Sequence, residues 1–385
     1  MPIEKLNRHP KIAWLCNSAI GPSETFLGDN LKLLQGFANV KAFSGNKTRE
    51  SVHPSVKALD FDDIPQRLHH ILGRKLTGRD IRTLLKRKRC HARLFQELKK
   101  FNPDVLWIEF GTTAHVASNL IQALGKPYII SVHGFDVSVS LQDNWYKSEF
   151  VRLAVSSKKV LCASLFIQDS LINLGIPREK CQVIRLGVSP PTNTTNKKTK
   201  HPSFIHVGRL VQVKNPLLLI RAFHIASQSI PDAVLTIVGD GPLREKATAL
   251  TRELDIANKV IFKGALNHPE SLLLVEENWA LCQAGKTCER GQQEAFGLSL
   301  AEAAVRGLPV VATKFGGIPE QVLHQKTGIL VEEDDLQGFA EAIRDIALHP
   351  QKAMKLGESG RHNILNLCNP IKRIEALKSL ISSIK

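Results

Sequence analysis

The sequence predicts an α/β protein with two domains, each built on a doubly wound parallel β-sheet. Apolar, β-branched segments alternate with longer segments of helical periodicity in both halves, which is typical of parallel sheets with crossover helices. The 385 residues exceed the size of one ordinary hydrophobic core. A polar, Pro-containing stretch without periodicity separates the halves. We therefore expect an N-terminal domain at 1–189, a linker at 190–202, a C-terminal domain at 203–365 and a final amphipathic helix at 366–385.

The composition narrows the class of protein. Hydrophobic residues make up 43% and charged residues 23% of the chain, as in ordinary globular proteins. The seven cysteines are dispersed without a CxxC pair, which favours reduced thiols over a disulfide framework or a zinc site. The first residues lack an apolar signal region, and no apolar run reaches the roughly 20 residues of a membrane span. The expected location is the cytoplasm, where the protein would meet a membrane only peripherally, on the inner face of the plasma membrane.

Six strands are expected in the first half, at residues 11–16, 39–43, 104–110, 127–132, 159–162 and 182–186. His133 follows the fourth of them and precedes Gly134. Substrates bind at such strand ends in parallel sheets, but a hydrogen-bonded structural histidine explains the position equally well. The turn after the first strand contains Ser23 and Glu24, either of which can begin the next helix near the same edge of the sheet.

Residues 67–100 form a strongly basic segment, with twelve Lys or Arg against Asp80 and Glu97. Apolar residues recur through it at helical spacing, so we expect a basic amphipathic helix. An anionic membrane surface or polyphosphate acceptor, a nucleic acid, and plain solvation of the charges are all open interpretations. Phe95 is the one aromatic residue among these charges, which disfavours binding to single-stranded nucleic acid.

The second half begins with a strand at 204–207 and a turn at 208–216. Arg209 and Lys214 lie in this turn, beside a strand end and before Pro216, which favours a helix start. Cations at such a place can stabilise a departing diphosphate, although solvent exposure alone would explain each of them. The next strand, 233–238, leads to a glycine turn that includes Gly241. It is a weak dinucleotide fingerprint, because Arg244 replaces the third glycine.

Residues 294–317 contain the strongest functional pattern. Glu294 and Glu302 flank a turn at Gly297 and the start of a short helix, and the strand 310–313 then leads to a second glycine turn. A helix N-terminus attracts anions, glycine permits close approach, and carboxylates accept hydrogen bonds from sugar hydroxyls. The pattern predicts a phosphate and polyol site. The alternative is that residues 299–302 form a capping box, in which Glu302 only satisfies backbone donors.

Four motifs resemble those of the retaining glycosyltransferases of family 4, which have the GT-B fold of two Rossmann-like domains facing a cleft. They are Glu-x7-Glu at 294–302, Gly-Leu-Pro-Val-Val-Ala-Thr at 307–313, Gly-Gly-Ile-Pro-Glu at 316–320 and Gly-Arg-Leu-x-x-x-Lys at 208–214. In the GT-B fold the last helix crosses back to the first domain, so the resemblance implies that the helix at 366–385 returns to the N-terminal domain. The turn Ser-Glu-Thr-Phe at 23–26 resembles a bacterial exopolysaccharide subgroup that includes colanic acid and amylovoran synthesis.

The resemblance implies a role for each matching residue. Arg209 and Lys214 would contact the nucleotide diphosphate, and Glu294 would hold the donor sugar. Glu302 would hold the ribose, and His133 would face the sugar from the other domain. The remaining donor-binding candidates are Phe296, Gly297, Leu298, Ser299, Gly208, Gly241, Ala265 and Leu266, and those on the acceptor side are Ser23 and Glu24.

The implied activity is metal-independent, retaining transfer of a hexosyl group from a nucleotide-diphosphate sugar to a lipid-linked or polysaccharide acceptor. We expect no metal, no cofactor beyond this donor substrate, no nucleic-acid partner and no protein nucleophile, with a UDP-sugar slightly favoured over a GDP-sugar. The alternatives are a catalytically inactive GT-B scaffold that binds polyanions or membrane, and a nucleotide-sugar epimerase.

Overall fold

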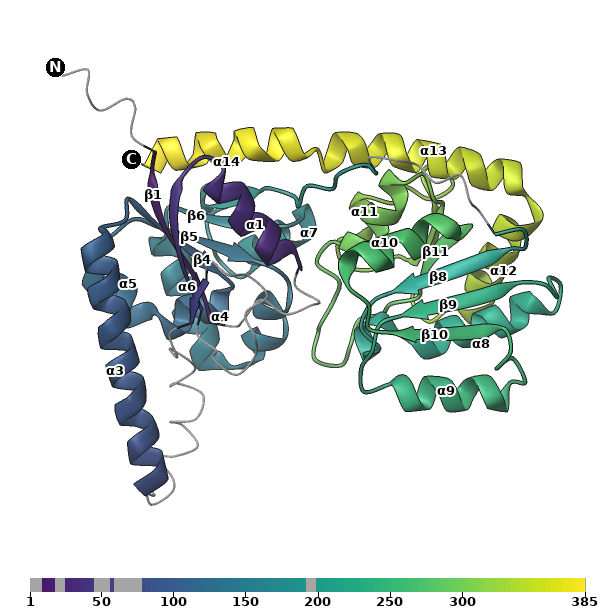
Figure 1. Cartoon of the computed structure of the whole chain (residues 1–385), viewed down its shortest axis with the longest axis horizontal. Helices are drawn as coiled ribbons and strands as arrows, with labels where there is room; N and C mark the ends of the chain where they lie inside the picture. The colour runs from purple at the N-terminus through teal and green to yellow at the C-terminus, as the bar shows by residue number, and fades with distance from the viewer. Residues whose placement is uncertain (1–8, 18–24, 45–55, 59–77, 192–198, 385) are drawn as a thin grey trace. The chain divides into compact units, whose positions relative to one another are not determined.

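The computed structural model describes residues 9–17, 25–44, 56–58, 78–191 and 199–384 (Figure 1). The chain divides into two compact units. Unit 1 comprises Met1–Cys162, Gln168–Ile184 and Ile374–Lys385, and unit 2 comprises Ala163–Ile167 and Arg185–Arg373. Ser23, Glu24, residues 67–77 of the basic segment and residues 192–198 of the expected linker lie outside the described residues.

Unit 1 is built on a parallel sheet of seven strands in the order β3-β2-β1-β4-β5-β6-β7. The strands are β1 (Lys11–Cys16), β2 (Asn39–Ser44), β3 (Val56–Ala58), β4 (Val105–Glu109), β5 (Tyr128–Val132), β6 (Lys159–Cys162) and β7 (Cys181–Val183). Every residue of β4 and β5 is buried, as expected for central parallel strands covered on both faces.

Helices cover this sheet. They are α1 (Thr25–Gln35), α3 (Gly78–Phe101), α4 (Gly111–Val116), α5 (Ser118–Leu124), α6 (Asn144–Ser156) and α7 (Leu165–Asn173), with most of α14 (Pro370–Ile384). One core cluster joins Trp14 and Trp107 of the sheet to Leu31 of α1 and to Leu377 and Ile381 of α14. The C-terminal helix therefore completes the core of the unit that contains the start of the chain.

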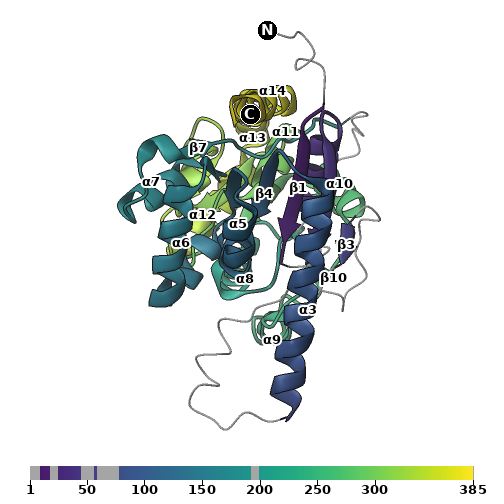
Figure 2. The ribbon, with the colours of Figure 1, turned by 90° about the vertical axis from the view of Figure 1, so that its left-hand side faces the viewer.

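Residues 78–100 of the basic segment belong to the 24-residue helix α3, whose later part packs on unit 1 through Leu94 and Leu98, both fully buried. Its first turns extend beyond the edge of the sheet in both views (Figures 1 and 2). Lys99 and Lys100 in the last turn are exposed. Within the described part of the chain, no helix combines the length and the apolar character that crossing a bilayer requires.

Unit 2 contains a parallel sheet of six strands in the order β10-β9-β8-β11-β12-β13. The strands are β8 (Ser203–Val207), β9 (Val234–Val238), β10 (Val260–Gly264), β11 (Ala280–Gln283), β12 (Val310–Thr313) and β13 (Ile329–Val331). The helices are α8 (Pro216–Ser227), α9 (Arg244–Glu253), α10 (His268–Glu277), α11 (Leu298–Val305), α12 (Leu336–Leu348) and α13 (Pro350–Leu367).

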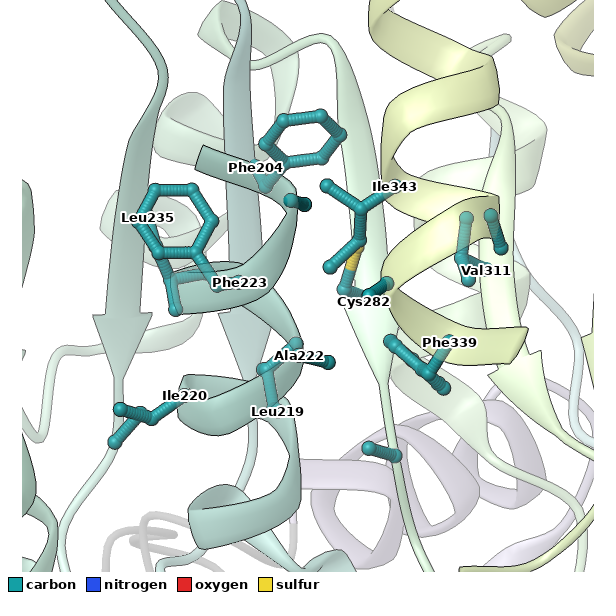
Figure 3. Close-up of a cluster of buried hydrophobic side chains, with 14 of the residues drawn as sticks. Phe204, Leu219, Ile220, Ala222, Phe223, Leu235, Cys282, Val311, Phe339 and Ile343 are labelled. Atoms are coloured by element: carbon teal, nitrogen blue, oxygen red, sulfur yellow. The ribbon is translucent and has the colours of Figure 1, made fainter. Parts of the chain in front are cut away.

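Successive strand residues of unit 2 point to opposite faces and form two cores. On one face Phe204, Cys282 and Val311 pack against α8 and α12, where Phe223 and Phe339 are fully buried (Figure 3). On the other face a second cluster packs residues of β8, β11 and β12 against α11 and α13. None of the seven cysteines, all of which lie in the described residues, forms a disulfide, and five of them are buried.

One predicted strand needs correction, and one strand has no counterpart in the prediction. The sequence predicts the sixth strand at 182–186, whereas β7 spans only Cys181–Val183. The Ile184 amide still donates to the Cys162 carbonyl of β6. Beyond it the chain has other partners: the Arg185 side chain pairs with Glu320 at 2.7 Å, and the Val188 amide donates to the Cys368 carbonyl. The short strand β3 was missed altogether, because three residues carry too little pattern.

Candidate active site

Arg209, Lys214 and Glu294 lie at the carboxyl edge of the unit 2 sheet. The strand order reverses between β8 and β11, and this reversal is where open α/β sheets bind ligands. Arg209 and Lys214 follow β8, whereas Glu294 follows β11 by a loop of ten residues, 284–293. Lys214 Nζ forms an ion pair with Glu294 Oε2, and only 17% and 16% of the two side chains are exposed. The structure thus joins two residues that lie 80 positions apart in the sequence.

The neighbours of Glu294 stabilise the ionised form of its carboxyl. Burial alone would raise the pKa of this carboxyl, but the charge and hydrogen bond of Lys214, the Gln283 amide and the charge of Arg209 outweigh it and lower the pKa. Gln283 Nε2 donates to Glu294 Oε2 at 3.2 Å. Arg209 is exposed and forms no ion pair with a described residue. The group therefore combines a shielded carboxylate with one paired and one unpaired cation.

The second glycine turn fixes the backbone of Glu294. The Gly317 amide donates to the Glu294 carbonyl at 2.9 Å. A Cβ on Gly316, which has a φ of 55°, would lie 2.1 Å from that carbonyl oxygen, and a Cβ on Gly317 would lie equally close to the carbonyl of Ala295. Only glycine permits this approach, so the Gly-Gly-Ile-Pro-Glu motif supports the carboxylate from behind.

Helix α11 begins beside this carboxylate. Its N-cap is Gly297, with a φ of 85°, and no side chain caps the helix. Gln321, which is buried, donates its amide to the carbonyls of Phe296 and Gly297 and holds the turn in place. The first amides of α11, at Leu298 and Ser299, are those that a helix leaves without an internal partner.

The capping-box interpretation of residues 299–302 is wrong. Ser299 lies inside α11, after the cap, and its hydroxyl donates to Gln283 Oε1 at 3.2 Å. Glu302 instead pairs with His268 Nε2 of α10 at 2.6 Å, and 14% of its side chain is exposed. Both carboxylates of the Glu-x7-Glu pattern therefore have side-chain partners from other elements rather than local backbone partners.

The glycines after β8 and β9 bring two loops into contact. A Cβ on Gly239 would lie 2.0 Å from the Gly208 carbonyl, and a Cβ on Gly241 would lie 2.6 Å from the Leu210 carbonyl. Gly239 and Gly241 thereby fix the loop that contains Arg209. Ala265 and Leu266 follow β10 on the same edge of the sheet, the first exposed and the second half-buried.

His133 lies in unit 1, directly after β5. Its Nε2 lies 2.7 Å from Oε2 of Glu109, the last residue of β4, and 10% of its side chain is exposed. Phe26 and Phe110 contact the imidazole ring at centroid distances of 4.7 and 4.9 Å. The buried Asp136 accepts from the amide of His133, which orders the turn. The expected contact of His133 with a sugar held by the other domain stays a prediction.

Sequence reasoning missed four residues of these sites. Gln283 and Gln321 hold Glu294 and the α11 turn, His268 pairs with Glu302, and Glu109 pairs with His133. Glu109 had a readable signal, because an acidic residue ends an otherwise apolar strand. The other three are common polar residues without a motif of their own.

Two family descriptions match the chain. "Glycosyltransferase Family 4" matches residues 52–190, and "Glycosyl transferases group 1" matches residues 192–363. Together they cover both halves in the order that the motifs predicted. The chain belongs to the family 4 glycosyltransferases.

Known proteins agree with this assignment. The amylovoran biosynthesis glycosyltransferase AmsK of Erwinia amylovora is 28% identical over 64% of this chain and 61% of its own length. A GDP-mannose-dependent phosphatidylinositol monomannoside mannosyltransferase of Mycolicibacterium smegmatis is 34% identical over 42% of each chain. The chain thus matches less than two thirds of the length of either relative.

The solved structure of HepE from Anabaena, in complex with UDP and glucose, superposes with a TM-score of 0.77. The match covers 97% of this chain and all of HepE at 20% identity. At this identity the likeness establishes the fold, which is GT-B as predicted.

Proposed function

We propose that this family 4 member is a retaining hexosyltransferase that moves a sugar from a nucleotide-diphosphate donor to a saccharide acceptor. The observation that carries the proposal is the Lys214–Glu294 ion pair with Arg209 beside it, next to the uncapped start of α11 at the point where the strand order reverses. Cations and helix amides suit a departing diphosphate, and a shielded carboxylate suits sugar hydroxyls.

The donor would separate the ion pair between Lys214 and Glu294. Lys214 moves from Glu294 to the diphosphate, where Arg209 and the amides at Leu298 and Ser299 add to the stabilisation of the leaving group. Glu294 exchanges its ammonium partner for donor hydroxyls, so its carboxylate oxygens stay hydrogen-bonded while Arg209 remains the nearby cation. Glu302 would hold the ribose after exchange with His268. The diphosphate itself would accept the proton of the attacking hydroxyl, on the face that it leaves.

The donor base and the acceptor are proposed from relatives. HepE was solved with UDP, whereas the mycobacterial relative is described as GDP-mannose-dependent, and we favour a UDP-sugar by a narrow margin. AmsK is described as an amylovoran enzyme, which supports a lipid-linked or polysaccharide acceptor in cell-surface glycan synthesis. Helix α3 would then contact the cytoplasmic face of an anionic membrane.

Thermal unfolding with UDP, GDP, ADP and their sugar conjugates tests the donor site, because a ligand that binds the native state raises the melting temperature. Turnover of the stabilising donor is then measured with and without EDTA, and the anomeric configuration of the product is read by NMR. We expect Lys214→Ala and Glu294→Ala to lower turnover by about 10²- to 10³-fold. Near-normal turnover in both variants, or the absence of any nucleotide-dependent stabilisation, would contradict the proposal. An inverted product or loss of turnover in EDTA would contradict only the retaining or metal-independent part.

A further inference from the structure

Glu109 is a fully buried carboxylate at the end of β4. Three N–H groups converge on its Oε1: Trp107 Nε1 at 2.8 Å, Trp14 Nε1 at 3.1 Å and Asn30 Nδ2 at 3.3 Å. Burial alone would raise the pKa of this carboxyl, but His133 and the two indoles outweigh it and the pKa is lowered. Glu109 is therefore ionised near neutral pH and can only accept hydrogen bonds.

The second oxygen, Oε2, faces His133 Nε2 at 2.7 Å. Because an ionised carboxylate has no proton to give, Nε2 must carry the proton of this hydrogen bond. Ser131 Oγ lies 3.2 Å from the same nitrogen. The other ring nitrogen, Nδ1, makes no hydrogen bond with a described residue. When the imidazole is neutral, the hydrogen bond to Glu109 places the proton on Nε2, so Nδ1 bears the lone pair and is an acceptor.

The surroundings give this acceptor a fixed direction. Phe26 and Phe110 contact the ring, so the imidazole is confined between aromatic neighbours. Phe110 itself has a φ of 72°, a value that side chains with a Cβ rarely adopt, directly after Glu109. A buried charge and a strained neighbouring residue are both costly to build, and backbone strain of this kind is concentrated at functional sites.

We propose that Glu109 is a positioning residue that fixes His133 as the Nε2–H tautomer, so that Nδ1 accepts a hydrogen bond from a saccharide hydroxyl. The inference rests on the proposed function, because it requires a saccharide substrate. If the bond between Glu109 and His133 were only structural, turnover would not depend on which ring nitrogen of His133 carries the proton. The tautomer is therefore the property to test.

Glu109→Gln is a sharp test because the structure dictates how the new amide lies. The three N–H donors at Oε1 keep the amide oxygen at that position, which places the NH₂ group against His133 Nε2. His133 must then accept at Nε2 and carry its proton on Nδ1, which turns the acceptor into a donor. We expect ¹⁵N spectra of the imidazole to change from Nε2–H to Nδ1–H, and turnover to fall about 10- to 100-fold. Stabilisation by the nucleotide, which binds in unit 2, should not change.

Glu149→Gln is the matched control. Glu149 pairs with Arg152 on α6, so this variant removes a carboxylate of the same unit without contacting His133. It should leave both the tautomer and turnover unchanged. If Glu109→Gln does not fold, the ¹⁵N spectrum of the wild type still tests the predicted tautomer. An Nδ1–H tautomer in the wild type would overturn the proposal.

Two assays identify the hydroxyl. One assay measures hydrolysis of the donor in the absence of an acceptor, and the other measures transfer to an acceptor. If Glu109→Gln lowers both activities, Nδ1 binds a hydroxyl of the donor sugar. If it lowers only transfer, Nδ1 binds a hydroxyl of the acceptor. Full turnover in a Glu109→Gln protein that shows the inverted tautomer would overturn the inference and leave the proposed function intact. Failure of the wild type to bind any nucleotide would instead remove the proposed function, while the tautomer could still be read.

Discussion

Replacing Lys214 with alanine should leave the shielded Glu294 carboxylate without its ion-pair partner and destabilise unit 2. Removing one partner of a buried ion pair costs about 3–5 kcal/mol. Both side chains keep 16–17% exposure, and Gln283 still donates to the carboxylate, so we expect the lower end, about 3 kcal/mol. For a unit of this size that corresponds to a fall in melting temperature of about 6–12 °C.

The pH dependence of the stability loss shows whether the charge of Glu294 causes it. In the wild type the pKa of Glu294 is lowered, so its contribution to stability is present above the unfolded pKa and is lost as the pH falls through the folded pKa. Without Lys214 the burial effect dominates and raises the pKa, so the carboxyl destabilises the fold as the pH rises past its usual value of 4.5. The stability gap between the two proteins should therefore be widest near neutral pH and shrink toward about pH 4.

The assay is urea or thermal unfolding of wild type and variant across this pH range. Adding Glu294→Gln to Lys214→Ala should restore part of the stability, because it removes the unpaired charge. Lys286→Ala is the control, since Lys286 forms an exposed pair with Asp334 at 3.3 Å whose loss should cost about 0–1 kcal/mol. A gap that does not vary with pH, or a double variant less stable than Lys214→Ala, would refute the reasoning.

Three further outcomes follow from the contacts. Gly239→Ala should cost about 2–4 kcal/mol and weaken nucleotide binding, because the new Cβ would collide with the Gly208 carbonyl at a φ of 132°; unchanged binding would argue against a role for that loop. Asp136→Ala leaves three amides without their acceptor and should lower the free energy of unfolding by about 2–4 kcal/mol in denaturant titrations. Thiol titration of the native protein should label the half-buried Cys90 and Cys288 before the five buried cysteines, and rapid labelling of all seven would contradict the packing.

The strand and helix pattern was readable from the sequence because each central strand is a short apolar run between turn residues. The 127–132 and 310–313 predictions agree closely with β5 and β12. The prediction was poorest at the edge strands of the unit 1 sheet. β3 has only three residues, and β7 ends before Arg185 and Val188, which have partners outside the sheet. Edge strands have neighbours on one side only, so tertiary contacts rather than local pattern set their length.

The sequence by itself determined the family and the candidate residues Arg209, Lys214, Glu294, Glu302 and His133, because motifs place these residues at strand ends and helix starts. Their roles in the site stay proposals. Only the tertiary structure decided their partners. Lys214 and Glu294 are 80 residues apart and meet because parallel strands bring their carboxyl ends to one edge. A capping box at 299–302 was as consistent with the sequence as the observed pair between Glu302 and His268. Which side chains pair depends on the order of the strands in the sheet, and a local sequence pattern does not determine that order.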